Sequence, residues 1–452
     1  MPKKFFSRRA APVAEPESQL GGKKAKTFAR LRGMKDVLFD EYRYWDLVFK
    51  KANDLARAYG FKRIDTPILE KQELYERSSG KTSDIVTKEM YSFVDQGGDK
   101  VAVRPEATPG LVRTYIEHGM FNLPQPVKMF FWGPVFRHDK PQAGRYRQHT
   151  QFDLEMIGEA GPAADAQLIL IAYNFFRELQ IEVVVQVNSI GCKECRKDYL
   201  VKLTKYYREK GRMAKLCPDC RKRLTKNPLR LLDCKEEKCM EMQVEAPQLV
   251  DSLDEACRDH FFKVVEYLDE AGVNYNLAPH LVRGLDYYTR TVFEVLPLGE
   301  NEGRQSSLGG GGRYDNLVEF MGGRPTPACG FGIGIERAIG KIKEKNIPLK
   351  EEDAPEVFIA QLGEAPRRKA IKLFEELRRH GFKLAQAFTK ESLKGQLEEA
   401  NKLNVKFTLI LGQKELQDGT ALIRDMESGV QEVVDFNKIR AELEKRLSNS
   451  KA

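Results

Sequence analysis

The chain of 452 residues contains no run of 18 apolar residues, which is about the length that a membrane-spanning helix needs. Its first residues, MPKKFFSRRAAPVA, are basic but lack the apolar core of a secretory signal. Glu15 and Glu17 interrupt what could otherwise be an organelle presequence. We therefore expect a soluble protein whose residues 1–28 form a disordered basic arm.

The usual glycine-rich phosphate loops are also missing. No glycine stretch continues into Gly-Lys-Ser/Thr, and GFGIG (330–334) lacks the spacing and context of a dinucleotide fingerprint. Nucleotide binding would therefore need another device, and arginine supplies one because its planar fork holds phosphate oxygens in pairs. The arginines next to expected strand ends, loops or helix starts are Arg137, Arg145, Arg283 and Arg337.

Positive charge is concentrated in two places. The net charge of +9 divides into +6 in residues 1–30, +9 in residues 192–239 and −6 over the remainder. A basic patch on a mildly acidic body favours a polyanion partner met at one place, whereas a lysine-rich solvated surface is the alternative. We favour the solvated surface for the arm and nucleic acid for residues 192–239.

Hydrophobic periodicity divides the chain into two parts. The first part predicts an amphipathic helix at 31–58, a strand containing Pro67 at 61–70, a hairpin of strands 126–138 and 146–158, and further strands over 274–298. After a charged linker at 346–354, strands and helices alternate, which predicts a separate α/β domain with parallel strands.

The densest group of polar residues is FRHDKPQAGRYRQHTQFDLE (136–155), which holds three arginines, one lysine and three carboxylates. Because side chains alternate along a strand, Phe152, Leu154 and Met156 share one face, which we expect to be core. The opposite face contains no apolar residue and either faces water or lines a polar pocket; it consists of Arg147, His149, Gln151, Asp153 and Glu155.

Eight cysteines occur, and four of them form two CxxC pairs inside the basic segment. Four thiolates at this spacing suit a tetrahedral structural zinc, and free thiols in a helical insertion are the alternative. Disulfides are rare in proteins of reducing compartments, and we expect none here. The predicted zinc ligands are Cys192, Cys195, Cys217 and Cys220.

Several stretches resemble one family in family order. The 136–155 segment resembles motif 2 of the class II aminoacyl-tRNA synthetases, GFGIGIERAI resembles motif 3, and the strand around Pro67 resembles motif 1. RPEAT (104–108), LVRGLDYY (281–288) and GGGGRYD (309–315) are similar to stretches of histidyl-tRNA synthetases. The resemblance spans about residues 29–440 and implies an α+β fold: an antiparallel sheet flanked by helices, a helical insertion and a C-terminal α/β anticodon-binding domain.

The resemblance also implies the reaction and its partners. ATP, accompanied by Mg²⁺, and L-histidine would form histidyl-adenylate, and histidine would pass to tRNA(His), in a cytoplasmic homodimer joined through motif 1. The expected domains are a catalytic core in two parts, 29–189 and 273–345, an insertion at 190–272 that approaches the tRNA acceptor arm, and the anticodon-binding domain at 355–445.

By resemblance, two sets of residues form the site. Arg137 and Arg283 would be catalytic cations at the α-phosphate, Arg145 would meet the outer phosphates, Arg337 would stack on adenine, and Asp139 belongs to the same ATP set. Around the histidine substrate the resemblance implies Glu106, Thr108 and Gln151 at the α-amino group, Glu155 and Tyr288 at the imidazole, and Tyr287 beside them.

The sequence departs from the family pattern at three positions. Ala107 stands where glycine is usual, His149 where an aromatic is usual, and Asp139 where glutamate is usual. One alternative is a non-catalytic relative that regulates the first enzyme of histidine biosynthesis; such relatives lack the C-terminal domain and usually lose motif arginines. Another is a pure RNA-binding protein. The retained arginines and residues 355–440 favour the enzyme.

Overall fold

A computed structural model describes residues 27–80, 83–139, 144–299, 307–349 and 354–449. The chain forms two compact units, Met1–Ile347 and Pro348–Ala452. Most of the predicted arm at 1–28, and residues 350–353 of the predicted linker, lie outside the described residues. The boundary between the units falls within that linker.

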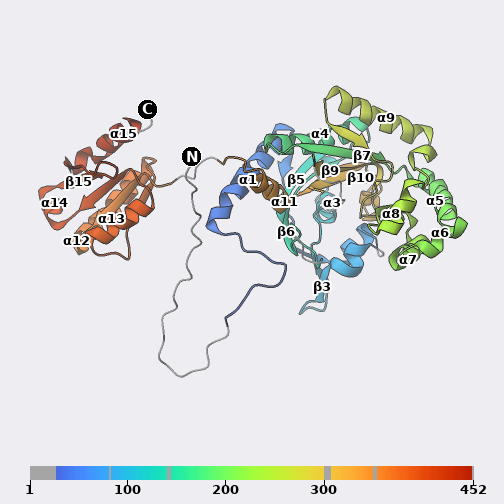
Figure 1. The fold of residues 1–452 in the computed structure, drawn as a ribbon, viewed down its shortest axis with the longest axis horizontal. Coiled ribbons are helices and arrows are strands. Elements are labelled where there is room, and N and C mark those ends of the chain that lie inside the picture. The colour runs from blue at the N-terminus through green and yellow to red at the C-terminus, as the bar shows by residue number, and fades with distance from the viewer. Residues whose placement is uncertain (1–26, 81–82, 140–143, 300–306, 350–353, 450–452) are drawn as a thin grey trace, which may run out of the picture. The chain divides into compact units, whose positions relative to one another are not determined.

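The first unit is built on an eight-stranded sheet (Figure 1). Its interior pairs are antiparallel, and only the edge pairs β1–β5 and β7–β8 are parallel. In sheet order the strands are β1 (Lys62–Arg63), β5 (Val127–Phe136), β6 (Gln148–Ile157), β11 (Ala328–Gly334), β10 (Gly309–Arg313), β9 (Thr289–Pro297), β7 (Val183–Ser189) and β8 (Tyr275–Leu277).

The structure shows whether the polar face of the central strand β6 is exposed to water or buried. Phe152, Leu154 and Met156 are buried, as predicted, and Phe152 contacts the rings of Phe175 and Phe331. The opposite face is also covered, since Asp153 is 3% and Glu155 1% exposed. The polar face is therefore buried at Asp153 and Glu155 rather than facing water there.

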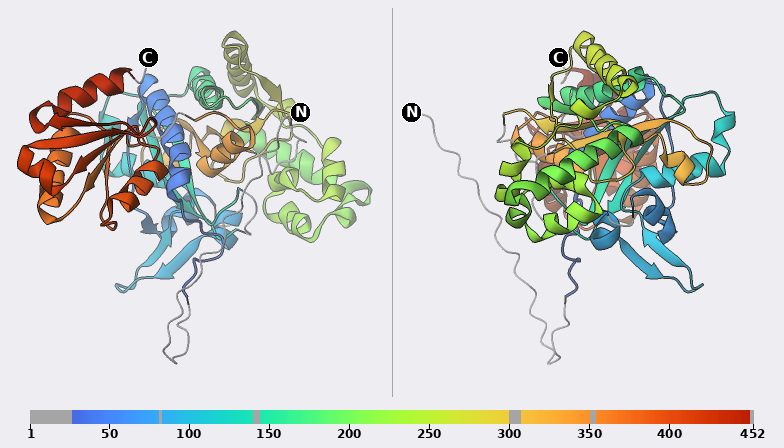
Figure 2. Two further views of the ribbon diagram at one scale, coloured as in Figure 1. Left: turned by 60° about the vertical axis from the view of Figure 1, so that its left-hand side comes forward. Right: turned by 90° about the vertical axis from the view of Figure 1, so that its right-hand side faces the viewer.

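Helices cover this sheet and a small second sheet projects from it (Figures 1 and 2). The small sheet has the order β2 (Leu69–Lys71), β4 (Lys100–Val103), β3 (Tyr91–Val94). The flanking helices are α1 (Phe39–Ala58), α2 (Gln72–Ser78), α3 (Thr108–Glu117), α4 (Pro162–Glu178), α9 (Glu255–Glu270), α10 (Leu317–Phe320) and α11 (Ile335–Glu344), with short turns at Ile85–Glu89 and Met120–Asn122. In the described part of the chain, no helix combines the length and apolarity that a membrane crossing requires.

Three predicted elements differ from the structure. Helix α1 begins at Phe39 rather than residue 31: Gly33 takes a φ of +86°, which a helix cannot contain, and Leu38, just before the helix, is extended. The strand predicted at 61–70 breaks into β1 and β2 around Pro67, which has no N–H for a ladder. Residues 278–288 form no strand between β8 and β9; Asn188 Nδ2 donates to the carbonyl of Leu281 (2.9 Å) in this connection.

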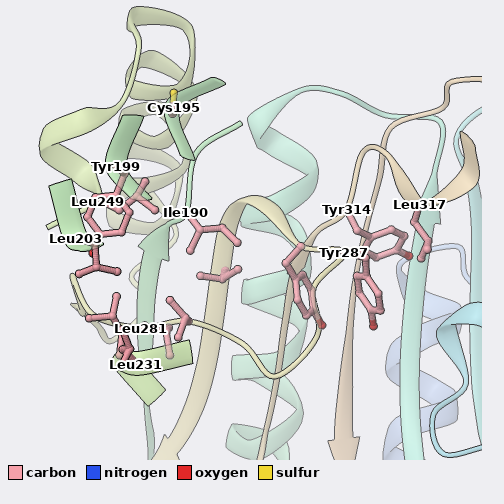
Figure 3. Close-up of a cluster of buried hydrophobic side chains, with 14 of the residues drawn as sticks. Ile190, Cys195, Tyr199, Leu203, Leu231, Leu249, Leu281, Tyr287, Tyr314 and Leu317 are labelled. Atoms are coloured by element: carbon pink, nitrogen blue, oxygen red, sulfur yellow. The ribbon is translucent and has the colours of Figure 1, made fainter. Parts of the chain in front are cut away.

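The segment between β7 and β8 is helical, as predicted for the cysteine-bearing residues. It contains α5 (Lys193–Arg208), α6 (Arg212–Lys215), α7 (Pro218–Lys226) and α8 (Glu237–Val244), with 3₁₀ turns at Glu209–Gly211, Pro228–Asp233 (η4) and Val250–Ser252. Its core is continuous with that of the sheet: Figure 3 shows buried side chains running from Tyr199 and Leu203 through Ile190 and Leu281 to Tyr287 and Tyr314.

The second unit has a mixed sheet rather than a wholly parallel one. Strand order is β13 (Leu384–Gln386), β12 (Val357–Gln361), β14 (Phe407–Leu411), β15 (Thr420–Asp425), β16 (Gln431–Asp435). The β12–β13 and β12–β14 pairs are parallel, as predicted, whereas β14–β15 and β15–β16 are antiparallel. Its helices are α12 (Glu364–Arg379), α13 (Leu393–Lys402), α14 (Gln413–Asp418) and α15 (Ile439–Asn449), with a 3₁₀ turn at Phe436–Lys438.

Candidate active site

A strip of glycine backbone forms the floor of the site. On β11, Gly330, Gly332 and Gly334 lie opposite Glu155, Asp153 and Gln151 of β6. A Cβ built on Gly330 would lie 1.6 Å from the Glu155 carboxylate and 2.6 Å from the Leu154 carbonyl oxygen. The GFGIG stretch therefore makes room for the polar face of β6 rather than holding phosphate in a loop.

The glycines of the GGGGRYD stretch make room for the side chain of an arginine. Gly310 of β10 lies opposite Gly332 on one side and Glu294 of β9 on the other. A Cβ on Gly310 would lie 2.8 Å from Arg283 Nη1, and that nitrogen donates to Glu294 Oε1 at 2.6 Å. Arg283 thus lies over the glycine strip, across from the carboxylates of β6.

Glu155 is held by two hydroxyl groups from other elements. Thr108, at the start of α3, donates to one carboxylate oxygen at 2.5 Å, and Tyr314 donates to the other. Burial is the main cause that raises the pKa of Glu155, to about 8, although both hydrogen bonds act in the opposite direction. The carboxyl therefore holds its proton more tightly than an exposed glutamate does.

Glu106 is bound in the same manner. Ser79 donates to it at 2.6 Å and Tyr287 at 2.9 Å. The side chain is 4% exposed, and burial raises its pKa. Tyr288, predicted beside the imidazole, is buried with its ring 4.8 Å from that of Tyr287.

A third carboxyl, Asp153, lies near Glu106 and Glu155. Burial and the neighbouring Glu155 raise its pKa well above the usual range. Among the described residues, no ion pair reaches Glu106, Asp153 or Glu155. Buried polar atoms without a hydrogen-bond partner also gather here, again within the described part: His149 Nδ1, Gln151 Oε1, Asp153 Oδ1 and Arg283 Nε. Such atoms need a polar ligand or water.

The predicted ATP residues line one cavity of about 820 Å³. Arg137 Nε donates to the Pro105 carbonyl at 2.8 Å, and Arg145 pairs with Asp139 at 2.8 Å. Arg337 Nε donates to the Gly144 carbonyl at 3.4 Å. The cavity wall contains all five residues predicted for ATP and one predicted for the histidine α-amino group: Arg137, Asp139, Arg145, Arg283 and Arg337, with Gln151. The other residues predicted for histidine are not in this wall: Glu106, Thr108, Glu155, Tyr287 and Tyr288.

The arginines are close enough to influence one another and His149. Burial and the charge of Arg145 lower the pKa of Arg337. Burial and the charge of Arg137 lower the pKa of His149 to about 3, so this imidazole is neutral at physiological pH. Such a concentration of positive charge in an enclosed wall favours a polyanionic ligand.

The metal site predicted from the two CxxC pairs is wrong in its membership. The structure places Cys217 and Cys220 with Cys234 and Cys239, and it places Cys192 and Cys195 with Asp254 and Cys257. Each pair caps a different helix, α7 for the first and α5 for the second, so spacing along the chain could not reveal that they lie apart.

Sequence reasoning also missed several residues of the site. Tyr314 lies within the quoted GGGGRYD stretch, and Asp153 lies on the polar face of β6, so both could have been found there. Glu294, the partner of Arg283, lies inside an apolar strand at a position that only the β9–β10 register reveals. Ser79 is far from Glu106 in sequence, and no pattern connects them.

Comparison with known proteins identifies the family. The profile for histidyl-tRNA synthetase matches residues 33–338, and the profile for an anticodon binding domain matches residues 356–446. The chain belongs to the histidyl-tRNA synthetase family. It has the α+β class II synthetase fold with an anticodon-binding domain, as the sequence motifs predict.

Individual relatives agree with this assignment over nearly the whole chain. The histidine–tRNA ligase of Dehalococcoides mccartyi is 44% identical over 92% of this chain and 99% of its own. That of Natranaerobius thermophilus is 43% identical over 88% and 94%. The crystal structure of apo S. aureus histidyl-tRNA synthetase superposes with a TM-score of 0.76 at 31% identity, covering 92% of this chain and 99% of that one.

We expect Gly330→Ala to destabilise the first unit by about 1–3 kcal/mol, because the new methyl group meets both a carboxylate and a backbone carbonyl. Gly340→Ala is the matched control, since Gly340 is an exposed position of α11 and a Cβ there meets nothing within 4 Å. The control should gain about 0.5–1 kcal/mol. Urea unfolding measures both changes. Equal stabilities for the two variants would contradict the predicted clash at Gly330.

Glu155→Gln should make stability less dependent on pH. The folded-state pKa of Glu155 is about 8 and its ordinary value is 4.5, so the folded protein binds the proton more tightly. Wild-type stability should therefore fall by up to a few kcal/mol as pH rises from about 4.5 to about 8. Unfolding midpoints across this range should fall less in Glu155→Gln, whereas Glu319→Gln, at an exposed carboxylate, should follow the wild type.

Proposed function

We propose that the chain ligates L-histidine to tRNA(His) through a histidyl-adenylate, with the residues predicted from its motifs acting in this cavity and beside it. The observation that carries the proposal is the pairing of two walls. Three buried carboxyls without a cationic partner in the described residues lie next to a cavity lined by Arg137, Arg145, Arg283 and Arg337. The first wall suits a cationic amino acid, and the second suits a triphosphate.

In the first step the histidine carboxylate attacks the α-phosphorus of ATP. A C–O–P bond forms, the bond to the β-phosphate oxygen breaks, and diphosphate leaves. Negative charge from both substrates meets at the α-phosphate, and cations fixed before the reaction stabilise that charge without reorganising. Arg137 and Arg283 supply these cations; the 2.6 Å bond to Glu294 holds Arg283 in place.

Arg145 contacts the outer phosphates and Arg337 stacks on the adenine ring, with Asp139 orienting Arg145 through their 2.8 Å ion pair. ATP enters as its magnesium complex, which makes the metal part of the substrate. The oxygen-rich triphosphate and the carboxylates of the cavity wall, among them Asp139 and Glu294, are the ligand type that Mg²⁺ prefers.

The histidine substrate is held by the carboxyl wall. Glu106, Thr108 and Gln151 receive the α-ammonium group, and the unpaired Gln151 Oε1 is an acceptor ready for it. Glu155 and Tyr288 contact the imidazole nitrogens, while Tyr287 and Tyr314 fix the two glutamates. An apolar amino acid would leave these buried groups unpaired, which discriminates by about 10⁴-fold or more in comparable sites.

In the second step a 3′-terminal ribose hydroxyl of tRNA attacks the histidyl carbonyl carbon, an ester forms and AMP leaves. The anticodon-binding unit and the basic insertion at 190–272 contact the tRNA, the latter through phosphates because residues 192–239 carry a charge of +9. This division of residues 29–345 into a two-part core and an insertion remains a prediction from the sequence.

The alternative of a regulatory relative is less well supported. Such a protein does not need arginines arranged for phosphoryl chemistry, yet Arg137, Arg283 and Arg337 all line the cavity here. The anticodon-binding profile also matches residues 356–446, a domain that the regulatory relatives are expected to lack. Translation takes place in the cytoplasm, and we place the protein there.

Arg283→Lys should lower histidine-dependent ATP–pyrophosphate exchange by about 10²–10³-fold, because a point charge replaces a fork fixed at the α-phosphate. The loss should lie mainly in kcat. Arg57→Lys, on the exposed face of α1, is the control and should keep wild-type rates. The proposed function would be contradicted if the wild type catalysed exchange with another amino acid but not with histidine. It would also be contradicted if the wild type catalysed no exchange with any amino acid.

A homodimer joined through the motif 1 region is the remaining part of the proposal. Ile68 and Leu69, which lie in this region, are 44% and 50% exposed. Light scattering should give twice the chain mass of 51.7 kDa for the wild type and the single-chain mass for Leu69→Asp. Leu298→Asp, at a similarly exposed apolar residue, should leave the mass unchanged; a monomeric wild type would refute the dimer.

A further inference from the structure

Four cysteine sulfurs meet at one point of the helical segment 190–272. Cys217, Cys220, Cys234 and Cys239 have their sulfurs within 4.8 Å of one another, and all four side chains are at most 5% exposed. None is in a disulfide. The Cys217–Cys234 sulfur separation is 3.8 Å, well beyond the roughly 2.05 Å of a disulfide bond.

The spacing of the sulfurs agrees with a tetrahedral metal. Zinc–sulfur bonds are about 2.3 Å long, so two sulfurs of a tetrahedral site lie about 3.8 Å apart. Among the described residues, this group of sulfurs contains no carboxylate or imidazole that could accept a thiol proton. Four buried thiols facing only one another make poor hydrogen bonds, whereas four thiolates around one cation satisfy every sulfur.

Backbone groups around the cluster favour negative sulfurs. The Cys220 N–H points at Cys217 Sγ (3.3 Å), and the Cys217 N–H points at Cys239 Sγ (3.4 Å). Cys217 caps the N-terminus of α7, and Cys239 lies in the first turn of α8. The partial positive charge of each helix N-terminus is thus directed at the sulfurs.

The second cysteine group has a different explanation. Cys192 and Cys195 donate to Asp254 Oδ2 at 3.2 and 3.0 Å, and Asp254 Oδ1 accepts from the Cys257 N–H at 2.7 Å. This carboxylate is exposed and caps α9, so protonated thiols are satisfied there without a metal. The group therefore serves as an internal comparison for the four-sulfur cluster.

We propose that Cys217, Cys220, Cys234 and Cys239 bind one structural Zn²⁺ per chain as thiolates. Binding replaces the four thiol protons, which pass to solvent, by four metal–sulfur bonds. An all-sulfur tetrahedral set with no open position is the ligand arrangement of structural zinc rather than of a catalytic one.

The position of this site gives it a role in the cavity. Cys217 and Cys234 themselves line the 820 Å³ cavity, together with Arg223 and Arg230. Arg223 and Arg230 bind Asp84 at 3.2 and 3.0 Å, and Arg230 also donates to the Arg283 carbonyl at 3.3 Å. The zinc thus holds α7, η4 and α8 together in one wall of the cavity. Arg230 of this wall supports the catalytic Arg283 by donating to its backbone carbonyl.

Elemental analysis of the purified full chain tests the site without reference to catalysis. We expect one equivalent of zinc per chain in the wild type, its loss in Cys220→Ala, and its retention in both Cys257→Ala and Cys329→Ala. Cys257 belongs to the comparison group, and Cys329 is a buried cysteine outside both groups. Wild-type protein without zinc, with iron in its place, or with zinc that survives in Cys220→Ala would overturn the assignment.

Replacement of zinc by Co²⁺ in the wild type keeps the test independent of variant folding. Four thiolate ligands should produce intense sulfur-to-cobalt charge-transfer and tetrahedral d–d absorption, which one equivalent of added Zn²⁺ abolishes. Octahedral, weakly absorbing cobalt would overturn the four-sulfur site.

The supporting role rests on the proposed function and has a separate readout. Removing zinc with a chelator should lower histidine-dependent exchange at least ten-fold while far-UV circular dichroism is retained. One equivalent of Zn²⁺, but not Mg²⁺, should restore it. Full activity of zinc-free protein would overturn the supporting role, and because metal content is measured directly, that failure is distinct from a failure of the synthetase assignment.

Discussion

The site depends on burying carboxyl groups that the chain does not neutralise by itself. Glu106, Asp153 and Glu155 lie in an enclosed wall, and burial raises the pKa of each one. A buried charge without a partner is costly, and hydroxyl groups offset part of this cost at Glu106 and Glu155. In the function proposed above, a ligand with cationic nitrogen atoms would supply the missing partner, and this cost would favour such a ligand over an apolar one.

Sheet geometry makes this wall possible. Neighbouring strands lie about 4.8 Å apart, so side chains that point to the same face normally fill the space between them. Here the glycines of β10 and β11 leave that space to side chains of other strands and loops: the β6 carboxyls lie over β11, and Arg283, paired with Glu294, lies over β10. The glycine strip therefore brings carboxyl groups and a guanidinium group of remote segments onto neighbouring strands of one sheet.

Several features could be read from residue order because they depend on local chemistry. The β5–β6 hairpin, the buried face of β6, and the helical cysteine segment all follow from side-chain alternation or helical periodicity. Other predictions failed where a distant contact decided the outcome. Residues 278–288 do not form a strand, and the Asn188 side chain donates a hydrogen bond to the Leu281 carbonyl in this segment. The two CxxC pairs lie apart, one at the start of α5 and the other at the start of α7.

The sequence by itself determined which chemical groups are present and which family motifs carry them: guanidinium groups in motifs 2 and 3, carboxylates on one strand face, and glycine where no side chain fits. Only the tertiary structure decided that Tyr314 and Thr108 share Glu155, that Ser79 reaches Glu106, and that four cysteines from three segments meet. The physical reason is that local sequence fixes conformation and polarity over a few residues, whereas burial and hydrogen-bond partners arise only when remote segments pack together.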